Sequence, residues 1–362
     1  MRAWIWSSAT LHGPRLPIVR QCRTLRRMGT WTSFERMSAV LAGERPDSPP
    51  VSFWHHFAPE QAHGKPAVDA HLQHLDRWGV DFLKVMNDNP YPAELGGQDI
   101  KALRSLGVLE GHELGFGRQL ELVTALRARL DGRLLFCTTI FNAWAVLRRL
   151  LMPNGRDRHG PPTLHGAPTP VDIKISEFLA ADRSAVATAL DVISDSLANF
   201  ARRCVEAGAD GIFLSVRDDW VNTEANGMDT YREIVRNGDL KILAAASSAQ
   251  LNMLHVCGVP QDFDLFASYR APVLNWADRD GGPPIREVIS RTSSLVCGGV
   301  DNLGTLARGT PADVETEIRD ALAQSGGHPM IISPGCTFDP DSVPSANLEA
   351  MVRVAREMKY SG

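Results

Sequence analysis

Short apolar runs alternate with amphipathic segments from Met37 to the end of the chain. Most of these runs are apolar throughout rather than at every second position, which is typical of parallel strands buried on both faces. Eight runs are predicted to be strands: Val51–Phe57, Val80–Met86, Leu134–Ile140, Gly211–Val216, Met253–Cys257, Pro272–Trp276, Leu295–Gly299 and Met330–Ser333.

Helical patterns lie between most of the runs, with apolar residues returning every three or four positions. Thr310 before Pro311 predicts a capped helix start. Eight strands separated by helices predict a single (β/α)8 TIM barrel of the α/β class. A doubly wound sheet is the alternative, but no glycine-rich turn with dinucleotide-binding spacing follows an early strand. The clearest predicted helices are Val68–Trp78, Glu177–Ala207, Ala312–Gln324 and Asn347–Met358.

The first residues differ in composition from the rest. Residues 1–28 contain six arginines, no lysine and no acidic residue, and the first carboxylate is Glu35. Such a start is either a transit peptide or sequence upstream of a true start at Met28 or Met37. We therefore expect residues 1–36 to be an Arg-rich extension, disordered or untranslated, and residues 37–362 to form the barrel domain.

Composition excludes several classes of protein. A net charge of −4 gives no electrostatic reason to expect a nucleic-acid partner. No apolar stretch is long enough to span a membrane. The six cysteines lie far apart in a long chain, which does not resemble a disulfide framework. These features favour a soluble, reduced, cytoplasmic protein.

In a barrel of this class the functional residues lie at the C-terminal ends of the strands. His255 and Cys257 end the fifth predicted strand, and Cys336 follows the eighth. One imidazole and two sulfurs are a donor set that zinc prefers, and three protein ligands leave a fourth position open, as in catalytic sites. The alternative is that the cysteines are small buried core residues, as we expect of Cys137, Cys204 and Cys297.

Further polar groups at the strand ends are candidate catalytic residues. His55 and His56 are candidate general acid or base groups, although neighbouring strand residues point to opposite faces, so at most one faces the interior. Asp88 ends the second predicted strand and is a candidate for binding an amine or ring N–H. An Asx turn before Pro90 is its alternative role.

Aromatic and acidic residues at other strand ends are candidate substrate-binding groups. A flat or apolar ligand would suit the tryptophans, whose alternative role is packing beneath loops. Capping of the next helix is the alternative for one aspartate of the Asp218–Asp219 pair. The candidates are Trp144, Asp218, Trp220 and Trp276.

Three segments carry a resemblance to a known family. They are Gly208–Leu214, Asn302–Leu303 and Pro334–Cys336, the last followed by Pro344, Asn347, Leu348 and Met351. Over about residues 37–360 the chain resembles the uroporphyrinogen decarboxylase (URO-D) superfamily, whose members are single (β/α)8 barrels.

The resemblance implies one of two chemistries. True decarboxylases act in porphyrin biosynthesis without a cofactor, using an aspartate, matched here by Asp88, and an early arginine loop. Residues 51–62 contain no arginine, which argues against binding a substrate with eight carboxylates.

The other branch comprises corrinoid-linked methyltransferases, in which an H-x-C pair and a late cysteine bind zinc and a thiol accepts the methyl group. His255, Cys257 and Cys336 match that pattern. The resemblance thus favours zinc-dependent methyl transfer from a corrinoid protein or small methylated donor to a thiol. Decarboxylation of uroporphyrinogen or a related tetrapyrrole, and non-catalytic binding of a tetrapyrrole or corrinoid, remain alternatives. The resemblance also implies a monomer or homodimer.

Overall fold

The computed structural model describes residues 31–152 and 169–360. Every helix and strand given below belongs to the unit that begins at Thr32. The Arg-rich stretch 1–28 lies outside the described residues. Helix α1 (Ser33–Leu41) spans the expected boundary at residues 36 and 37, so the domain limits stay a prediction.

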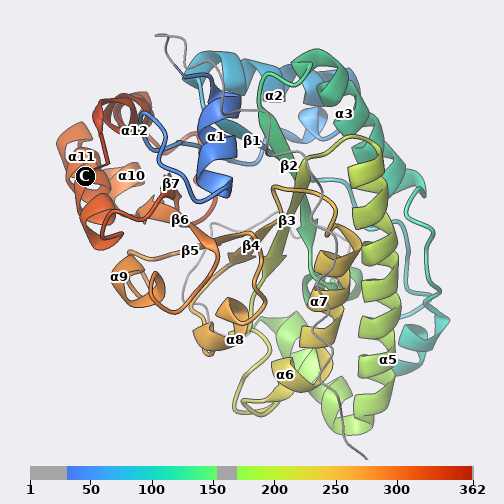
Figure 1. Ribbon diagram of the computed structural model, residues 1–362. Helices are drawn as coiled ribbons and strands as arrows, with labels where there is room; N and C mark the ends of the chain where they lie inside the picture. The colour runs from blue at the N-terminus through green and yellow to red at the C-terminus, as the bar shows by residue number, and fades with distance from the viewer. Residues whose placement is uncertain (1–30, 153–168, 361–362) are drawn as a thin grey trace, which may run out of the picture. The chain divides into compact units, whose positions relative to one another are not determined.

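Parallel strands form the centre of the fold (Figure 1). They follow one another in the order β1-β2-β3-β4-β5-β6-β7, each paired in parallel with the next along the chain. Seven of the eight predicted strands are confirmed to within two residues at each end: β1 (Phe82–Val85), β2 (Leu135–Phe141), β3 (Gly211–Val216), β4 (Met253–Val256), β5 (Val273–Trp276), β6 (Leu295–Val300) and β7 (Met330–Pro334).

The first predicted strand is wrong as a continuous strand, although its residues take the eighth position. Residues 51–57 make only two isolated bridges, Val51 with Ile332 and His55 with Phe338. The amide of Ile332 in β7 donates to Pro50 O (2.8 Å), and on the other side the amide of Asp81 donates to Val51 O (2.8 Å). Side chains replace the ladder here, because Asp81 Oδ2 accepts from the Val51 amide (2.8 Å). The segment therefore closes the barrel between β7 and β1.

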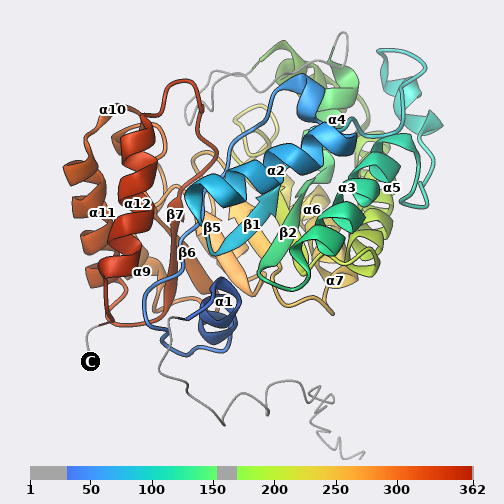
Figure 2. The same cartoon turned by 90° about the horizontal axis from the view of Figure 1, so that it is seen from above.

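Helices surround the strands (Figure 2). The four predicted helices are confirmed, with ends within one residue at the C-terminus, in α2 (Gly64–Trp78), α5 (Pro170–Glu206), α11 (Pro311–Gln324) and α12 (Ser345–Glu357), and Thr310 caps α11 by accepting from the Asp313 amide. Helix α5 breaks at Asp182, which leaves helical geometry. No helix in the described part of the chain is long and apolar enough to cross a membrane. The other α-helices of the described residues, besides α1, are α3 (Leu114–Leu130), α4 (Ala143–Leu151), α6 (Thr230–Ile234), α7 (Arg236–Ala245), α8 (Phe263–Ala267), α9 (Ile285–Val288) and α10 (Thr305–Arg308).

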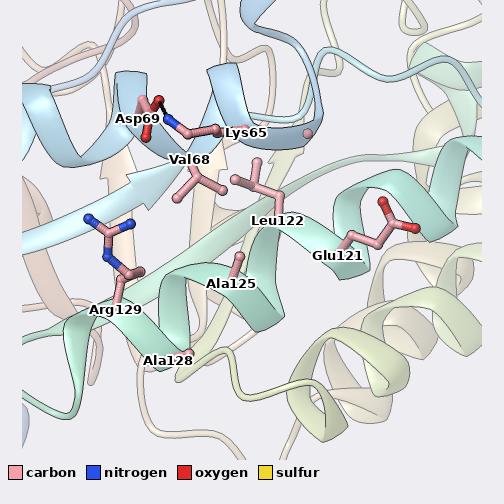
Figure 3. Close-up of a pocket in the computed structure, with 9 residues that line it drawn as sticks. Lys65, Val68, Asp69, Glu121, Leu122, Ala125, Ala128 and Arg129 are labelled. Atoms are coloured by element: carbon pink, nitrogen blue, oxygen red, sulfur yellow. Dashed lines mark hydrogen bonds and ion pairs between the residues drawn. The ribbon is translucent and has the colours of Figure 1, made fainter.

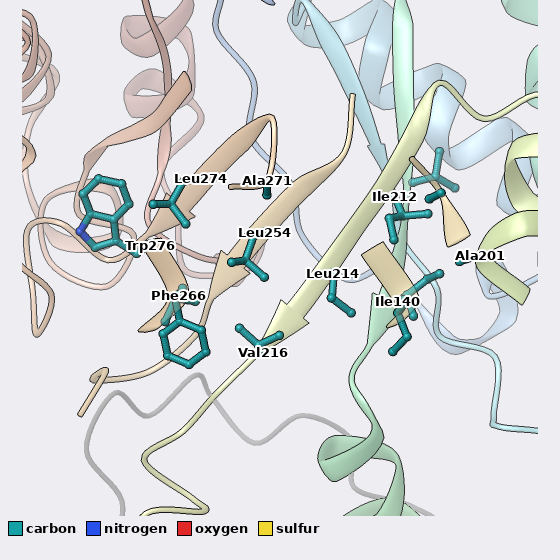
Figure 4. Packing of buried hydrophobic residues seen from close by; sticks show 14 of the residues in the cluster. Ile140, Ala201, Ile212, Leu214, Val216, Leu254, Phe266, Ala271, Leu274 and Trp276 are labelled. Carbon is teal, nitrogen blue, oxygen red and sulfur yellow. The ribbon is translucent and has the colours of Figure 1, made fainter. Parts of the chain in front are cut away.

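Alternation along the strands separates two hydrophobic clusters. Outward residues pack against the helices, as Leu254 and Leu274 do beside Phe266 of α8 (Figure 4). Inward residues such as Phe82 and Phe213 form a second cluster inside the barrel, which Met37 of α1 joins. Because the apolar members from the strands lie toward the strand starts, α1 packs at the N-terminal end, and the C-terminal end is left for polar groups.

Candidate metal centre

The three predicted metal ligands come together at the C-terminal end of the barrel. His255 lies in β4, Cys257 directly follows it, and Cys336 follows β7. The distance between the Sγ atoms of Cys257 and Cys336 is 3.9 Å, and that from Cys336 Sγ to His255 Nε2 is 3.4 Å. All three ligand atoms lie within 4.8 Å of one another. Residues 79 positions apart in the sequence thus converge on one point.

These separations fit a tetrahedral zinc ion. With Zn–S of about 2.3 Å and Zn–N of about 2.0 Å, two sulfur ligands lie about 3.8 Å apart and a nitrogen and a sulfur about 3.5 Å apart. The two separations given above are close to these values. Both cysteines are free thiols rather than a disulfide. The donor set and its spacing therefore suit zinc, with one position left open.

A neighbouring amide fixes the orientation of the His255 ring. Nδ1 of His255 lies 2.6 Å from Asn275 Oδ1, its partner across the β4–β5 ladder. The amide nitrogen of Asn275 donates to Cys297 O (2.9 Å), Ser333 Oγ (3.2 Å) and Pro334 O (3.2 Å), so Oδ1 must be the atom that faces the ring. Nδ1 therefore carries the proton, and the lone pair of Nε2 faces the sulfurs.

Asn275 is not among the candidate residues chosen from the sequence. The signal was present, because an amide stands in a run of apolar residues, Pro272–Trp276, that is buried on both faces. Buried polar side chains need hydrogen-bond partners, so such a residue in a barrel strand indicates a polar network.

The two thiols ionise as a pair. Contact with Cys257 lowers the pKa of Cys336 to about 6, because the thiolate of Cys336 accepts the S–H of Cys257. The same contact, together with burial, raises the pKa of the remaining Cys257 thiol. The first proton thus leaves near neutral pH, while the second requires a positive charge such as a metal ion.

A buried lysine that sequence reasoning missed lies inside the same barrel. Lys84 in β1 is 4% exposed, and its Nζ lies 4.6 Å from the centre of the Phe213 ring. The His255 ring stacks on Phe213 at 5.1 Å. The signal was again a charged residue within an apolar strand, because lysine is almost never fully buried without a specific reason.

The candidate catalytic residues occupy two different environments. Nδ1 of His56 lies 2.7 Å from Asp88 Oδ1, and both side chains are half-buried. His55 turns elsewhere: its Nδ1 contacts His56 O, and its ring packs against Phe57 and Phe338. Burial lowers the pKa of His55. The structure thus brings His56 and Asp88 together and leaves His55 among aromatic rings.

The four candidate substrate-binding residues are mostly enclosed. Asp218 is fully buried, accepts from the amides of Gln261 and Asp262, and has its pKa raised by burial to about 6. Trp144 is buried in the outer cluster, and Trp276 points outward from β5 into the same cluster. Their burial gives the substrate-binding roles no support, and those roles stay predictions.

Trp220, the fourth candidate, is half-buried between two arginines. The guanidinium carbons of Arg148 and Arg217 lie 3.5 Å and 4.0 Å from its ring centre. Arg217 also forms a bidentate pair with Asp219. A Cβ atom on Gly258 would meet Arg217 Nε at 2.6 Å, so the glycine after Cys257 lets this pair pack against the ligand loop.

A surface groove lies elsewhere, between α2 and α3. It has a volume of about 500 Å³, with Val68 and Leu122 at its base and Lys65 and Glu121 among its lining residues (Figure 3). None of the three ligand residues lines it. Donor chemistry and burial therefore make the barrel interior, rather than this groove, the candidate active site.

Comparisons with known proteins agree with this site. The sequence model of the uroporphyrinogen decarboxylase (URO-D) family matches residues 167–358, more than half of the chain and all three ligand positions. Methylcobamide:CoM methyltransferase MtbA of Methanosarcina acetivorans is 28% identical over 173 residues, 47% of this chain and 49% of the relative. MtaA of Methanosarcina barkeri is 25% identical over 174 residues, 48% and 49% of the two chains. The chain spans about half the length of the curated relatives it matches.

A solved structure extends the likeness of fold over most of the chain. A methyltransferase from Methanosarcina mazei superposes with a TM-score of 0.65 at 18% identity, covering 91% of this chain and 99% of that chain. At this identity the match concerns the fold, and it agrees with the predicted barrel.

Proposed function

The chain belongs to the uroporphyrinogen decarboxylase family, and on that premise we propose that it is a zinc-dependent methyltransferase with a thiol as methyl acceptor. Its relatives MtbA and MtaA are named methylcobamide:CoM methyltransferases. We propose by analogy that the donor is a methylated corrinoid carried by a partner protein, and that the acceptor is a small thiol of the coenzyme M class.

The observation that carries the proposal is the convergence of His255 Nε2, Cys257 Sγ and Cys336 Sγ within 4.8 Å. Zinc, when bound, supplies an open position at which an acceptor thiol becomes a nucleophilic thiolate. Cys257 and Cys336 contribute two negative charges to the site, which favours high electron density on the acceptor sulfur.

The remaining residues of the site are given supporting roles. Asn275 holds the His255 ring with Nε2 directed at the sulfurs. The His56–Asp88 pair is a candidate acceptor for the proton that the thiol loses, since the carboxylate contacts Nδ1 and orients the imidazole. His55, packed among rings, is assigned no part in proton transfer.

Decarboxylation of uroporphyrinogen is the less favoured function. It needs fixed cations for the carboxylates of its substrate, and residues 51–62 contain no arginine. It also gives no reason for an imidazole and two thiols to converge. Non-catalytic binding of a tetrapyrrole or corrinoid leaves the same convergence without a purpose.

Metal content measured beside two assays tests the proposal. We expect about one zinc per full-length chain, methyl transfer from free methylcobalamin to 2-mercaptoethanesulfonate, and no turnover of uroporphyrinogen. The Cys257→Ala variant should lose both zinc and transfer. The matched control is Cys297→Ala, which removes another buried interior thiol and should keep both. Uroporphyrinogen turnover by metal-free protein would overturn the proposal.

A further inference from the structure

Lys84 is a charged side chain in the barrel interior with no role in the function proposed above. Its neighbours in β1, Leu83 and Val85, belong to the outer cluster, whereas Phe82 belongs to the inner one. Strand side chains alternate between faces, so Lys84 points inward with Phe82. Its contacts with Phe213 and Trp54, both members of the inner cluster, agree with this direction.

The surroundings of the Lys84 ammonium are poor in negative charge. Nζ donates to Met86 Sδ (2.7 Å) and lies over the Phe213 ring. Among the described residues, no carboxylate lies within ion-pair distance of Nζ. A thioether and an aromatic face compensate weakly for the loss of water, and burying an unpaired ammonium costs several kcal/mol. The buried ammonium of Lys84 therefore lowers the stability of the fold, which points to a function for this side chain.

The nearby groups that favour the charged lysine include both thiols of the metal site. Burial lowers the pKa of Lys84 to about 8, so the ammonium stays largely protonated at pH 7. Burial, with a smaller contribution from the charge of Lys84, lowers the pKa values of His55 and His71. The groups whose negative charge acts against the burial effect on Lys84 are, in order, Cys336, Cys137, Asp88 and Cys257.

The count of charges at the centre shows where a cation is needed. A divalent metal with the thiolates of Cys257 and Cys336 and the neutral ring of His255 has no net charge. A thiolate in the fourth position brings the total to −1, inside a barrel where charge is costly. One ammonium on the inner wall returns the total to zero.

We propose that Lys84 makes the site select an anionic fourth ligand, by stabilising the acceptor as a thiolate rather than as a thiol. This inference rests on the proposed function and identifies the acceptor's charge state. In the step concerned, the S–H bond of the acceptor would break and its proton would pass to the His56–Asp88 pair named above, leaving the acceptor as a thiolate. Lys84 keeps its own proton and acts as an electrostatic positioning residue.

Arg217 is the rival cation, because it packs against the loop that carries Cys257. Its guanidinium already forms a bidentate pair with Asp219, at 2.5 and 2.7 Å, so that carboxylate balances its charge. Lys84 has no such carboxylate among the described residues. Of these two cations, Lys84 is therefore the one whose positive charge is not compensated by a carboxylate of the described residues.

Cobalt-loaded full-length protein provides a test that does not depend on catalysis. Sulfur-to-cobalt charge transfer reports the binding of 2-mercaptoethanol, a thiol with an uncharged tail, as a function of pH. In Lys84→Met the pH midpoint for thiolate binding should rise by about one unit, and affinity at pH 7 should fall about tenfold. Lys84→Arg keeps the positive charge and should restore most of the binding.

A neutral ligand separates charge from structural damage. Imidazole occupies a fourth position without adding charge, so its affinity should be the same in Lys84→Met and the unaltered protein. Lys65→Met, which removes an exposed ammonium on α2, is the surface control and should leave the affinities for both the thiol and imidazole unchanged. Equal weakening of thiol and imidazole binding, or an unmoved pH midpoint in Lys84→Met, would overturn the inference.

The two hypotheses fail in different ways. Absence of stoichiometric cobalt or zinc in the unaltered protein contradicts the proposed metal centre. Normal metal binding with an unchanged thiol titration in Lys84→Met leaves the metal centre intact and contradicts the role of Lys84. Should the methionine variant not fold, Lys84→Gln, which keeps a polar side chain without the charge, decides by the same titration.

Discussion

Two buried polar clusters in this molecule look alike by burial and differ in chemistry. One is the ligand group of His255, Cys257 and Cys336 inside the barrel. The other surrounds Asp239 of α7, whose carboxylate accepts hydrogen bonds from the hydroxyl groups of Tyr231 and Tyr269. Both contain a titratable group whose pKa lies far from its usual value.

The clusters differ in whether their acceptors already have donors. Asp239 Oδ1 also accepts from Asn142 (3.2 Å), so every side chain in that network is bonded to another. In the ligand group, three lone-pair atoms face one another, and only the thiol protons of Cys257 and Cys336 can lie among them. A saturated network holds α6, α7 and the end of β2 together, whereas convergent lone-pair atoms whose only donors are displaceable thiol protons indicate a cation. A perturbed pKa alone does not distinguish the two.

Removing one ligand sulfur should have the largest effect, which is the loss of metal binding at the ligand group. In Cys336→Ala we expect zinc affinity to fall by more than about a hundredfold, since loss of a direct ligand exceeds the loss of an outer-shell partner. Circular dichroism should remain that of a folded barrel. Elemental analysis of the purified protein measures the zinc, and full retention would contradict the metal centre.

Changing the charge of the Asp239 cluster should alter the free energy of unfolding without affecting metal binding at the ligand group. Burial raises the pKa of Asp239 to about 7, well above the usual value of an aspartate. The folded state therefore holds this proton more tightly, so the group's contribution to stability is greatest below about pH 4 and is lost as the pH rises through 7.

Asp239→Asn imitates the protonated carboxyl group, so its folding stability should not show the decrease that Asp239 causes as the pH rises. Relative to the unaltered protein, we expect the variant to gain on the order of 2–4 kcal/mol between pH 4 and pH 7, with no further change above. Urea unfolding at several pH values measures it. The comparison between proteins cancels the opposite trend from buried His71, whose pKa is lowered to about 4. A constant difference across this range would show that Asp239 is already ionised when folded.

Removing the side chain that orients a ligand should weaken metal binding less than removing a ligand itself. Asn275→Ala removes the acceptor that fixes the His255 ring, and loss of such an outer-shell partner weakens metal binding about 10- to 100-fold. Competition with a zinc-chelating dye measures the affinity. The matched control is Asn142→Ala, which removes an amide from the Asp239 network and should leave zinc affinity unchanged. Equal losses of zinc affinity in both variants would show that Asn275 has no specific role at the ligand group.

A change outside both clusters gives the baseline. Thr310→Ala removes the N-cap of α11 and should cost about 1 kcal/mol of unfolding free energy. Zinc content and the pH dependence assigned to Asp239 should stay as they are. A change in either property on this substitution would mean that the two readouts report general stability.

The sequence predicted much of the fold because local patterns determine it. Runs buried on both faces read as parallel strands, and seven of them are confirmed; helices with apolar residues at three- and four-residue spacing are confirmed as well. The segment 51–57 could not be assigned correctly, because its composition suits a strand while its partners at Asp81 and Ile332 lie far away in the chain.

Residue type and order were enough to select His255, Cys257 and Cys336, since few donor sets suit a soft metal ion. What they could not determine was direction. Trp276 ends a strand as the candidate residues do, yet it points outward into the helical layer, and Lys84 sits in an apolar run yet points inward. A strand's two faces become different only when the sheet closes, because closure decides which face encloses a shared interior. Local sequence thus determined the elements and their chemistry, and the closed barrel alone decided which side chains meet.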